Sequence, residues 1–283
     1  MTEFELTFDG GLAEDGLLEF YDAARALAGF QRSLALTTHL ALNGEIITQA
    51  PKASGFQIFI PPFIEGSWKT RAKLAIGATF ALGSVGKDSP VGHIVTSLYD
   101  AALSTTMGFH IDYDKTIQQL YAENNPDKPI TAEKIDSLCE KIEASVADMH
   151  RPIVISKSAN RAQITKLGYD PKNVGPLLSP ITYDYVRQTT KDQDDSIVKG
   201  YISSYNINTF KGRIYSIDES RPISFELDDP ARSKKTVGIL TRSQHINGQN
   251  PFSQEALVEL VCRKMISSSG KVKRYLVLSV QTV

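Results

Sequence analysis

Cysteine is scarce in this sequence, which contains two, Cys139 and Cys262, among 283 residues. A disulfide framework needs several cysteine pairs, and a zinc site needs ligands at short spacing. The pair therefore predicts buried free thiols in a reducing compartment. The first residues, 1–6, are acidic and alternating, whereas a secretory signal has a basic start followed by an apolar core. Both observations predict a cytoplasmic protein.

Long apolar runs are missing as well. The uncharged stretch 74–86 has 13 residues, whereas a membrane-spanning helix needs about 20. The next apolar stretch, 91–109, contains His93 and Asp100, and an ionisable side chain is unfavourable in the middle of a bilayer. We therefore expect buried core helices in this region and no membrane partner.

The motifs of nucleotide cofactors and activated serines are also absent. The glycine-rich segments 10–11, 83–86 and 267–270 match neither GxGxxG nor GxxxxGK[ST], the spacings with which backbone amides hold phosphates. No serine lies in a GxSxG motif. These absences favour a non-enzymatic protein that uses no cofactor.

One segment is suited to enzyme chemistry. On a strand, His110, Asp112 and Asp114 would share one side, as in a hard-metal or hydrolytic site. However, Asp112 or Asp114 is equally suited to cap a helix that starts near Lys115, and the sequence offers no further ligands to complete a site. A metal-dependent hydrolase around His110 and Asp112 is therefore a third hypothesis, and we predict no metal site.

The net charge of −1 conceals a division along the chain. Residues 197–283 contain 13 lysines and arginines against 7 aspartates and glutamates, a balance of +6, whereas residues 1–196 have a balance of −7. Such an asymmetry is typical of two parts with different tasks. The polar segment 191–196 lies where the balance changes, so we expect a linker there, between a domain at 1–190 and another at 197–283.

The first part predicts an α+β domain, in which several helices cover a small sheet. Residues 3–8 alternate strictly between polar and apolar, which is typical of a half-buried strand. A helix with an apolar stripe is expected at about 16–42 with Asp15 as its N-cap, and another at 132–149 with Thr131 as its N-cap. Both helices must bury one face.

Shorter elements complete this domain. Residues 55–60 and 67–73 favour the two strands of a hairpin, with a basic face on the second strand, although a helix at 68–83 is an alternative. The remaining elements are two short strands and a loop, expected at 152–156, 161–165 and 168–180.

The second part predicts a small β-barrel. Three strand-like runs are followed by a helical segment starting near Asp229-Pro230 and then by two more strand-like runs, so that strands are expected at 197–206, 210–217, 221–227, 256–265 and 271–283. This order of elements resembles an OB-fold, a five-stranded barrel that uses one face for oligonucleotides or oligosaccharides. The resemblance implies a binding module.

Alternation along the barrel strands gathers basic and aromatic side chains on the expected outer face. Rings there would stack on bases and cations would contact phosphates, whereas the alternative is that tyrosines are favoured strand residues and lysines protect edges. Glu226 and Asp228 interrupt this face. The candidate residues, including those of the last hairpin, are Lys199, Tyr201, Tyr205, Lys211, Arg213, Tyr215, Lys271, Lys273 and Arg274.

Two functional hypotheses follow. The first is a nucleic-acid-binding protein that uses the basic, aromatic face of the barrel. The second is a protein-interaction or assembly subunit that forms homo- or hetero-oligomers, because opposite charges on two parts of one chain suit head-to-tail association. Salt-dependent binding of nucleic acid would favour the first, and a salt-sensitive oligomer without nucleic acid would favour the second.

Overall fold

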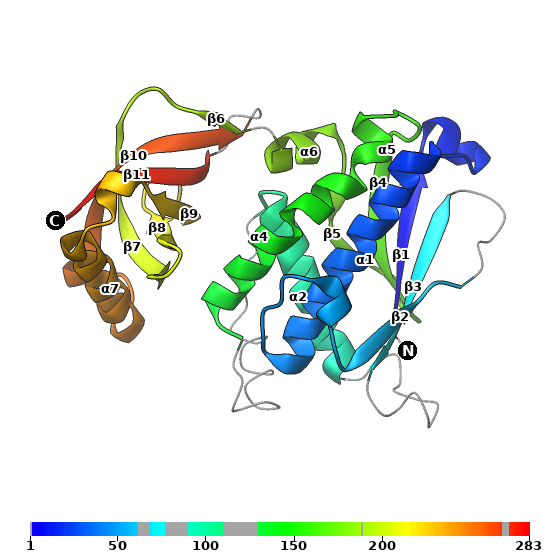
Figure 1. Ribbon diagram of the computed structural model, residues 1–283, viewed down its shortest axis with the longest axis horizontal. Helices are drawn as coiled ribbons and strands as arrows, with labels where there is room; N and C mark the ends of the chain where they lie inside the picture. Colours follow the sequence, from blue (N-terminus) through cyan, green and yellow to red (C-terminus); the bar gives the residue numbers. More distant parts are fainter. Residues whose placement is uncertain (1, 62–67, 77–89, 110–129, 188, 268–271) are drawn as a thin grey trace. The chain divides into compact units, whose positions relative to one another are not determined.

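The chain folds into two compact units, Met1–Val186 and Arg187–Val283. A computed structural model describes residues 2–61, 68–76, 90–109, 130–187, 189–267 and 272–283 (Figure 1). The expected linker at 191–196 lies within the second unit, where Lys191 ends strand β6 (Thr189–Lys191) and Ser196 begins strand β7. No helix among the described residues has both the length and the apolar composition needed to cross a bilayer.

The first unit is built on an antiparallel sheet of five strands in the order β2-β3-β1-β4-β5. Strand β1 is central, because it pairs with β3 on one side and with β4 on the other. Its residues alternate between polar and apolar, so one face of the strand is apolar. The strands are β1 (Thr2–Asp9), β2 (Phe56–Phe59), β3 (Lys69–Ile76), β4 (Arg161–Leu167) and β5 (Lys172–Leu178).

Helices cover one face of this sheet (Figure 1). The long helices α1, α2 and α4 pack against one another, and short helical segments connect the other elements. Their bounds are η1 (Gly11–Asp15), α1 (Phe20–Asn43), η2 (Ala50–Lys52), α2 (Pro90–Thr106), α4 (Ala132–Met149), α5 (Arg151–Val154) and α6 (Pro180–Arg187).

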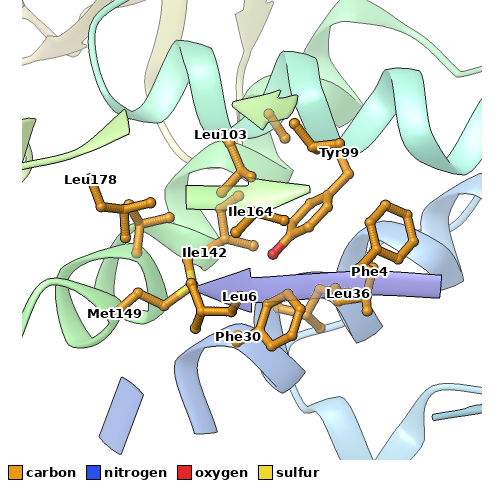
Figure 2. Packing of buried hydrophobic residues seen from close by; sticks show 14 of the residues in the cluster. Phe4, Leu6, Phe30, Leu36, Tyr99, Leu103, Ile142, Met149, Ile164 and Leu178 are labelled. Carbon is orange, nitrogen blue, oxygen red and sulfur yellow. The ribbon is translucent and has the colours of Figure 1, made fainter. Parts of the chain in front are cut away.

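The core of the first unit lies between the sheet and these helices. Figure 2 shows Phe4 and Leu6 of β1 facing Phe30 of α1 and Tyr99 of α2, and all four side chains are almost completely buried. Phe4 and Tyr99 meet edge to face, with ring centroids 5.8 Å apart. The other face of β1 is polar, and there Glu5 forms an ion pair with Arg71 of β3 at 2.7 Å. The expected α+β architecture of this part is therefore confirmed.

Helix α1 begins later than the sequence predicted. Its N-cap is Glu19, whose carboxylate accepts hydrogen bonds from the backbone N–H groups of Tyr21 and Asp22, at 3.1 and 2.8 Å. Asp15, the expected cap, instead ends the short helix η1. The prediction for α4 is confirmed, because this helix spans Ala132–Met149 and the Thr131 side chain accepts from Lys134 N–H.

Two predictions in the first unit were wrong. The expected strand at 152–156 overlaps helix α5, in which Pro152 occupies the first turn, where a missing N–H is harmless. The expected loop at 168–180 contains β5, which tolerates Pro176 because it is an edge strand. Gly175 allows this strand to pass close to α2: its N–H donates to the Asp100 carboxylate at 2.6 Å, and its φ of +71° disfavours other residues.

The second unit is a closed β-barrel of five strands. Antiparallel pairs join β7 to β8, β8 to β9, β10 to β7 and β10 to β11, and a parallel pair of β9 with β11 closes the ring. The elements are β7 (Ser196–Asn206), β8 (Lys211–Ser216), β9 (Arg221–Leu227), η4 (Asp229–Ala231), α7 (Lys234–Gln249), η5 (Gln254–Ala256), β10 (Leu257–Ser267) and β11 (Val272–Thr282).

Helix α7 packs beside β7 and covers a part of that strand that β10 does not reach (Figure 1). Ser243 Oγ accepts a hydrogen bond from Ile202 N–H at 3.3 Å, and Asn247 Nδ2 donates to the Ile202 carbonyl at 3.2 Å. Ser243 Oγ also donates to the Ala256 carbonyl at 2.5 Å. Because buried backbone groups need partners, α7 substitutes here for a neighbouring strand.

Candidate functional site

Strands β8 and β11, with β9 between them, present lysine and arginine on the outside of the barrel. Arg213 of β8 lies opposite Ser224 of β9, and Ser224 lies opposite Arg274 of β11. Residues that alternate with them, such as Ile214 and Phe225, are buried in the barrel core, so the charged side chains point outward. We call the outward residues of these strands the basic face: Lys211, Arg213, Tyr215, Ser224, Glu226 and Arg274.

The charge of the basic face is predominantly positive. Arg274 Nη1 lies 3.7 Å from Glu226 Oε2, and Lys211 lies opposite the same glutamate on the neighbouring strand. Three cations, those of Lys211, Arg213 and Arg274, thus share the face with one carboxylate. Asp228, expected to interrupt the face, instead caps η4.

The last hairpin is described in part. Lys273 is half-buried on β11, next to Arg274, and Lys271 lies outside the described residues. The structure therefore brings Lys211, Arg213, Tyr215 and Arg274 of the predicted residues together on β8 and β11, on either side of β9.

Lys199 and Tyr201 lie on β7, where Tyr201 is opposite Tyr215 of the basic face. Lys199 is exposed on β7, where its Nζ lies 3.6 Å from Glu259 Oε2 of β10. Tyr201 points outward as expected, but only 8% of it is exposed, because it packs against Leu257 and Phe252. A ligand could not stack on the Tyr201 ring without displacing these residues.

The prediction that Tyr205 lies on the outer face was wrong. The pairing of β7 with β8 shifts by one residue between Ile202 and Ser204, and such a bulge reverses the face on which the following residues lie. Tyr205 therefore points into the barrel core and stacks on Phe225. Burial raises the pKa of its hydroxyl.

Phe252 is an aromatic residue that the sequence analysis missed. It lies in the connection between α7 and β10, is 56% exposed, and contacts the rings of Tyr201 and Tyr215 edge to face at 5.3 and 5.2 Å. Its N–H donates to Asn247 Oδ1 at 3.0 Å, which helps to hold its unusual φ of +62°. No periodicity marks a loop residue, so only its size and apolar character signalled a role.

The described residues contain no recognisable catalytic centre. Among them, no three histidine, cysteine or acidic side chains cluster as a metal would require, and burial raises the pKa of the Cys262 thiol to about 12. The His150 ring is buried and bonds to the Val146 carbonyl and to Thr182 Oγ1 at 2.7 and 2.9 Å, so both nitrogens have structural partners. The segment with His110, Asp112 and Asp114 lies outside the described residues.

The first unit has an exposed apolar patch at the start of α1. Leu17 N–H donates to the Leu12 carbonyl, and the guanidinium of Arg151 lies over the Tyr21 ring at 5.3 Å, so η1, α1 and α5 meet here. Phe20, at the first position of α1, is 86% exposed. We define the apolar patch by its exposed members Leu12, Leu17, Phe20, Tyr21 and Ile155.

Comparisons with known proteins identify two families along the chain. Residues 4–186 match the family described as Domain of unknown function (DUF7946), and residues 196–281 match the one described as Family of unknown function (DUF7947). The two matches coincide closely with the two compact units. Neither the curated proteins nor the solved structures with which the chain was compared gave a significant match.

Proposed function

We propose a function for this chain, which belongs to the family Domain of unknown function (DUF7946): it binds single-stranded nucleic acid on the basic face of its barrel. The strand order β7-β8-β9-β11-β10, with α7 between β9 and β10, resembles the order of an OB-fold, which supports the proposal. OB barrels bind oligonucleotides mainly on their second and third strands. Here β8 and β9 occupy these positions, and they contribute most of the basic face.

The observation that supports this proposal best is the register of the three cations. Lys211 and Arg213 are two residues apart on β8, which places their side chains about 7 Å apart, and Arg274 lies two strands away at the level of Arg213. Neighbouring cations of this kind suit successive phosphates of an extended strand, and phosphate contacts supply most of the affinity in non-specific binding. Glu226 reduces the positive charge of the basic face without cancelling it.

Aromatic rings adjoin these cations. Tyr215 follows Arg213 on the same side of β8 and is half-buried, and Phe252 contacts its ring edge to face at 5.2 Å. Stacking of a base on such a ring contributes about 1–3 kcal/mol. The stacking residues of the proposal are therefore Tyr215, which the sequence predicted, and Phe252, in place of Tyr201 and Tyr205.

Fluorescence anisotropy with a labelled oligodeoxythymidine tests the proposal. With three phosphates neutralised, the basic face alone should contribute about −2 to the slope of log affinity against log salt concentration. The double variant Lys211→Gln/Arg274→Gln should make this slope shallower by about 1.4. Its charge-matched control is Lys52→Gln/Lys172→Gln, two exposed lysines of the first unit. Absence of binding by the wild-type chain at about 50 mM salt would overturn the proposal.

The apolar patch favours a second candidate function, assembly of copies of this chain. Exposed clusters of large apolar side chains mark protein contacts. Glu14 and Asp15 are exposed beside the patch, and the basic balance of residues 197–283 complements them. The occupant that fits these charges is the barrel of a second copy, in a head-to-tail contact.

Light scattering at two salt concentrations tests assembly. A wild-type oligomer that dissociates as salt increases, and that Phe20→Ser abolishes without lowering the melting temperature, would support the contact. Tyr169→Ser removes another fully exposed aromatic ring of the same unit and should leave the oligomer intact. A chain that is monomeric at low salt would exclude this candidate.

A further inference from the structure

Helix α7 carries cations that lack acidic partners. Lys234, Lys235 and Arg242 are exposed, the helix contains no aspartate or glutamate, and within the described residues no ion pair involves these three side chains. Several other basic residues of the barrel have a carboxylate within 4 Å. These paired residues are Lys199, Arg221, Arg232, Arg263 and Arg274. The positive charge of α7 is therefore not offset by any carboxylate on the helix itself.

The geometry of α7 places much of this charge on its solvent side. Thr236, Leu240 and Ser243 are buried against the barrel. At 100° per residue, Lys234, Arg242 and His245 lie on the opposite side of the helix. We call the exposed residues of this side the α7 face: Lys234, Lys235, Gly238, Thr241, Arg242 and His245.

Gly238 lies near the centre of the α7 face, and nothing in the surrounding structure requires a glycine at this position. A Cβ atom built on Gly238 would meet nothing within 4 Å, and its φ is helical, so neither crowding nor backbone conformation requires glycine. Glycine weakens an exposed helix relative to alanine. Without a side chain at this position, the backbone of an elongated ligand can approach the helix axis closely. Such an approach would explain why residue 238 is glycine.

The α7 face and the basic face meet at one end of the barrel. Leu227 N–H donates to the Phe210 carbonyl at 2.9 Å, immediately before Lys211, and Arg232 Nε donates to the Leu227 carbonyl at 3.1 Å, two residues before Lys234. Asp229 lies at this junction, but its carboxylate is 2.7 Å from Arg232 Nη1. Arg232 therefore lies between Lys211 and Lys234 along this end of the barrel, together with the carboxylates of Asp228 and Asp229.

We propose that the α7 face binds the sugar-phosphate backbone of the same nucleic acid that contacts the basic face. This inference rests on the proposed function, and it extends the binding path from the barrel strands along α7. A bilayer surface fits less well, because membrane-bound amphipathic helices insert large apolar side chains, and the α7 face has lysine, glycine, threonine, arginine and histidine instead.

The first experiment removes the three unpaired charges. Lys234→Gln/Lys235→Gln/Arg242→Gln should lower the affinity for a labelled 20-nucleotide oligodeoxythymidine by about tenfold or more at about 100 mM salt, and should make the log-log salt slope shallower by about 2. The control Lys52→Gln/Lys69→Gln/Lys172→Gln removes three exposed lysines of the first unit and should change the affinity by less than about twofold. Circular dichroism melts check that each variant is folded.

The second experiment fills the space at Gly238. Gly238→Gln should raise or maintain the melting temperature, because glutamine favours helices, and should lower the affinity by about threefold or more if the nucleic-acid backbone occupies this space. A variant that is more stable and binds less tightly cannot be explained by damage to the fold.

The outcomes separate the two proposals. If the wild type binds and both α7 variants bind as tightly as the control, the α7 inference is wrong and the basic face stands alone. If the wild type does not bind at about 50 mM salt, the proposed function fails and the α7 inference fails with it. If the triple variant loses self-association in light scattering but keeps its affinity for the oligonucleotide, α7 contacts protein and the inference is wrong.

Discussion

Tyr205 stacks on Phe225 inside the barrel, with ring centroids 6.1 Å apart and planes 10° from parallel. The Tyr205 hydroxyl is buried, and within the described part of the chain it has no hydrogen-bond partner. A buried polar group without a partner destabilises the native state by about 1–3 kcal/mol. Tyr205→Phe keeps the ring and should therefore raise the free energy of unfolding by about 1 kcal/mol, measured by urea denaturation.

This variant also tests where Tyr205 lies relative to the ligand. Because the ring is in the core, Tyr205→Phe should leave the affinity for an oligonucleotide unchanged, whereas Phe252→Ala, at an exposed ring, should weaken it. A loss of stability in Tyr205→Phe would mean that the hydroxyl has a partner. That result would contradict the assignment of this side chain to an apolar environment.

Gly29 marks the closest approach of α1 and α4. A Cβ atom on Gly29 would overlap the carbonyl oxygen of Ser145 and come within 3.3 Å of Asp148 and Met149. Gly29→Ala should therefore destabilise the first unit by about 2 kcal/mol, although alanine favours helices by about 1 kcal/mol over glycine. Urea denaturation followed by far-ultraviolet circular dichroism measures this change.

Gly238 supplies the matched control for Gly29. Both are helical glycines, but a Cβ atom on Gly238 has no neighbour within 4 Å. Gly238→Ala should stabilise the barrel by about 0.5–1 kcal/mol, the ordinary difference in helix propensity. If both variants are stabilised, the helices α1 and α4 do not pack as closely as described.

His150 links stability to pH. Burial lowers the pKa of His150 from 6.5 to about 4. Between these values the unfolded chain binds a proton that the native chain does not, so stability falls as pH decreases from about 6.5 and levels off below about 4. The slope is about 1.4 kcal/mol per pH unit, which gives a total of about 3 kcal/mol.

The measurement is urea denaturation at several pH values between 4 and 7. His150→Gln removes this titration, so the difference in stability between the wild type and the variant should shrink as pH falls. His39, whose pKa burial also lowers, titrates in both proteins and cancels in the comparison. A difference that stays constant with pH would show that the pKa of His150 is the same in the native and the unfolded chain.

Regular periodicity explains which elements the sequence predicted well. The stripe of Ile135, Leu138, Ile142 and Val146 has helical spacing, and these side chains are buried in α4. In the barrel, each of the five expected strands overlaps an observed strand closely, and Arg221–Leu227 coincides with β9. Local sequence patterns are enough to predict a helix or a strand where each residue follows the same period as its neighbours.

The sequence could not predict features that depend on distant residues. The bulge between Ile202 and Ser204 turns Tyr205 inward, and no residue within β7 marks it, because it arises where α7 bonds to Ile202. Phe252 reaches Tyr215 only through the folded connection after α7. The candidate site consequently contains the predicted cations Lys211, Arg213 and Arg274 and the predicted Tyr215, whereas Phe252 takes the place of Tyr201 and Tyr205.

Ser243 should be essential for the attachment of α7 to the barrel. Its hydroxyl is buried, accepts from Ile202 N–H and donates to the Ala256 carbonyl. Ser243→Ala leaves both backbone groups without this partner, so it should destabilise the barrel by about 1–3 kcal/mol. Thr241→Ala removes an exposed hydroxyl that bonds within α7 and should change stability by less than about 0.5 kcal/mol.

Hydrogen exchange distinguishes the origin of this loss. In Ser243→Ala, exchange of the Ile202 amide should accelerate more than exchange of the neighbouring Ile214 amide, because β8 still pairs with β7 at that level. Since α7 carries the unpaired cations, weakening its attachment should also lower the affinity for an oligonucleotide by disordering the α7 face. Equal acceleration across all barrel amides would instead indicate global destabilisation, and Ser243 would then have no local role in holding α7.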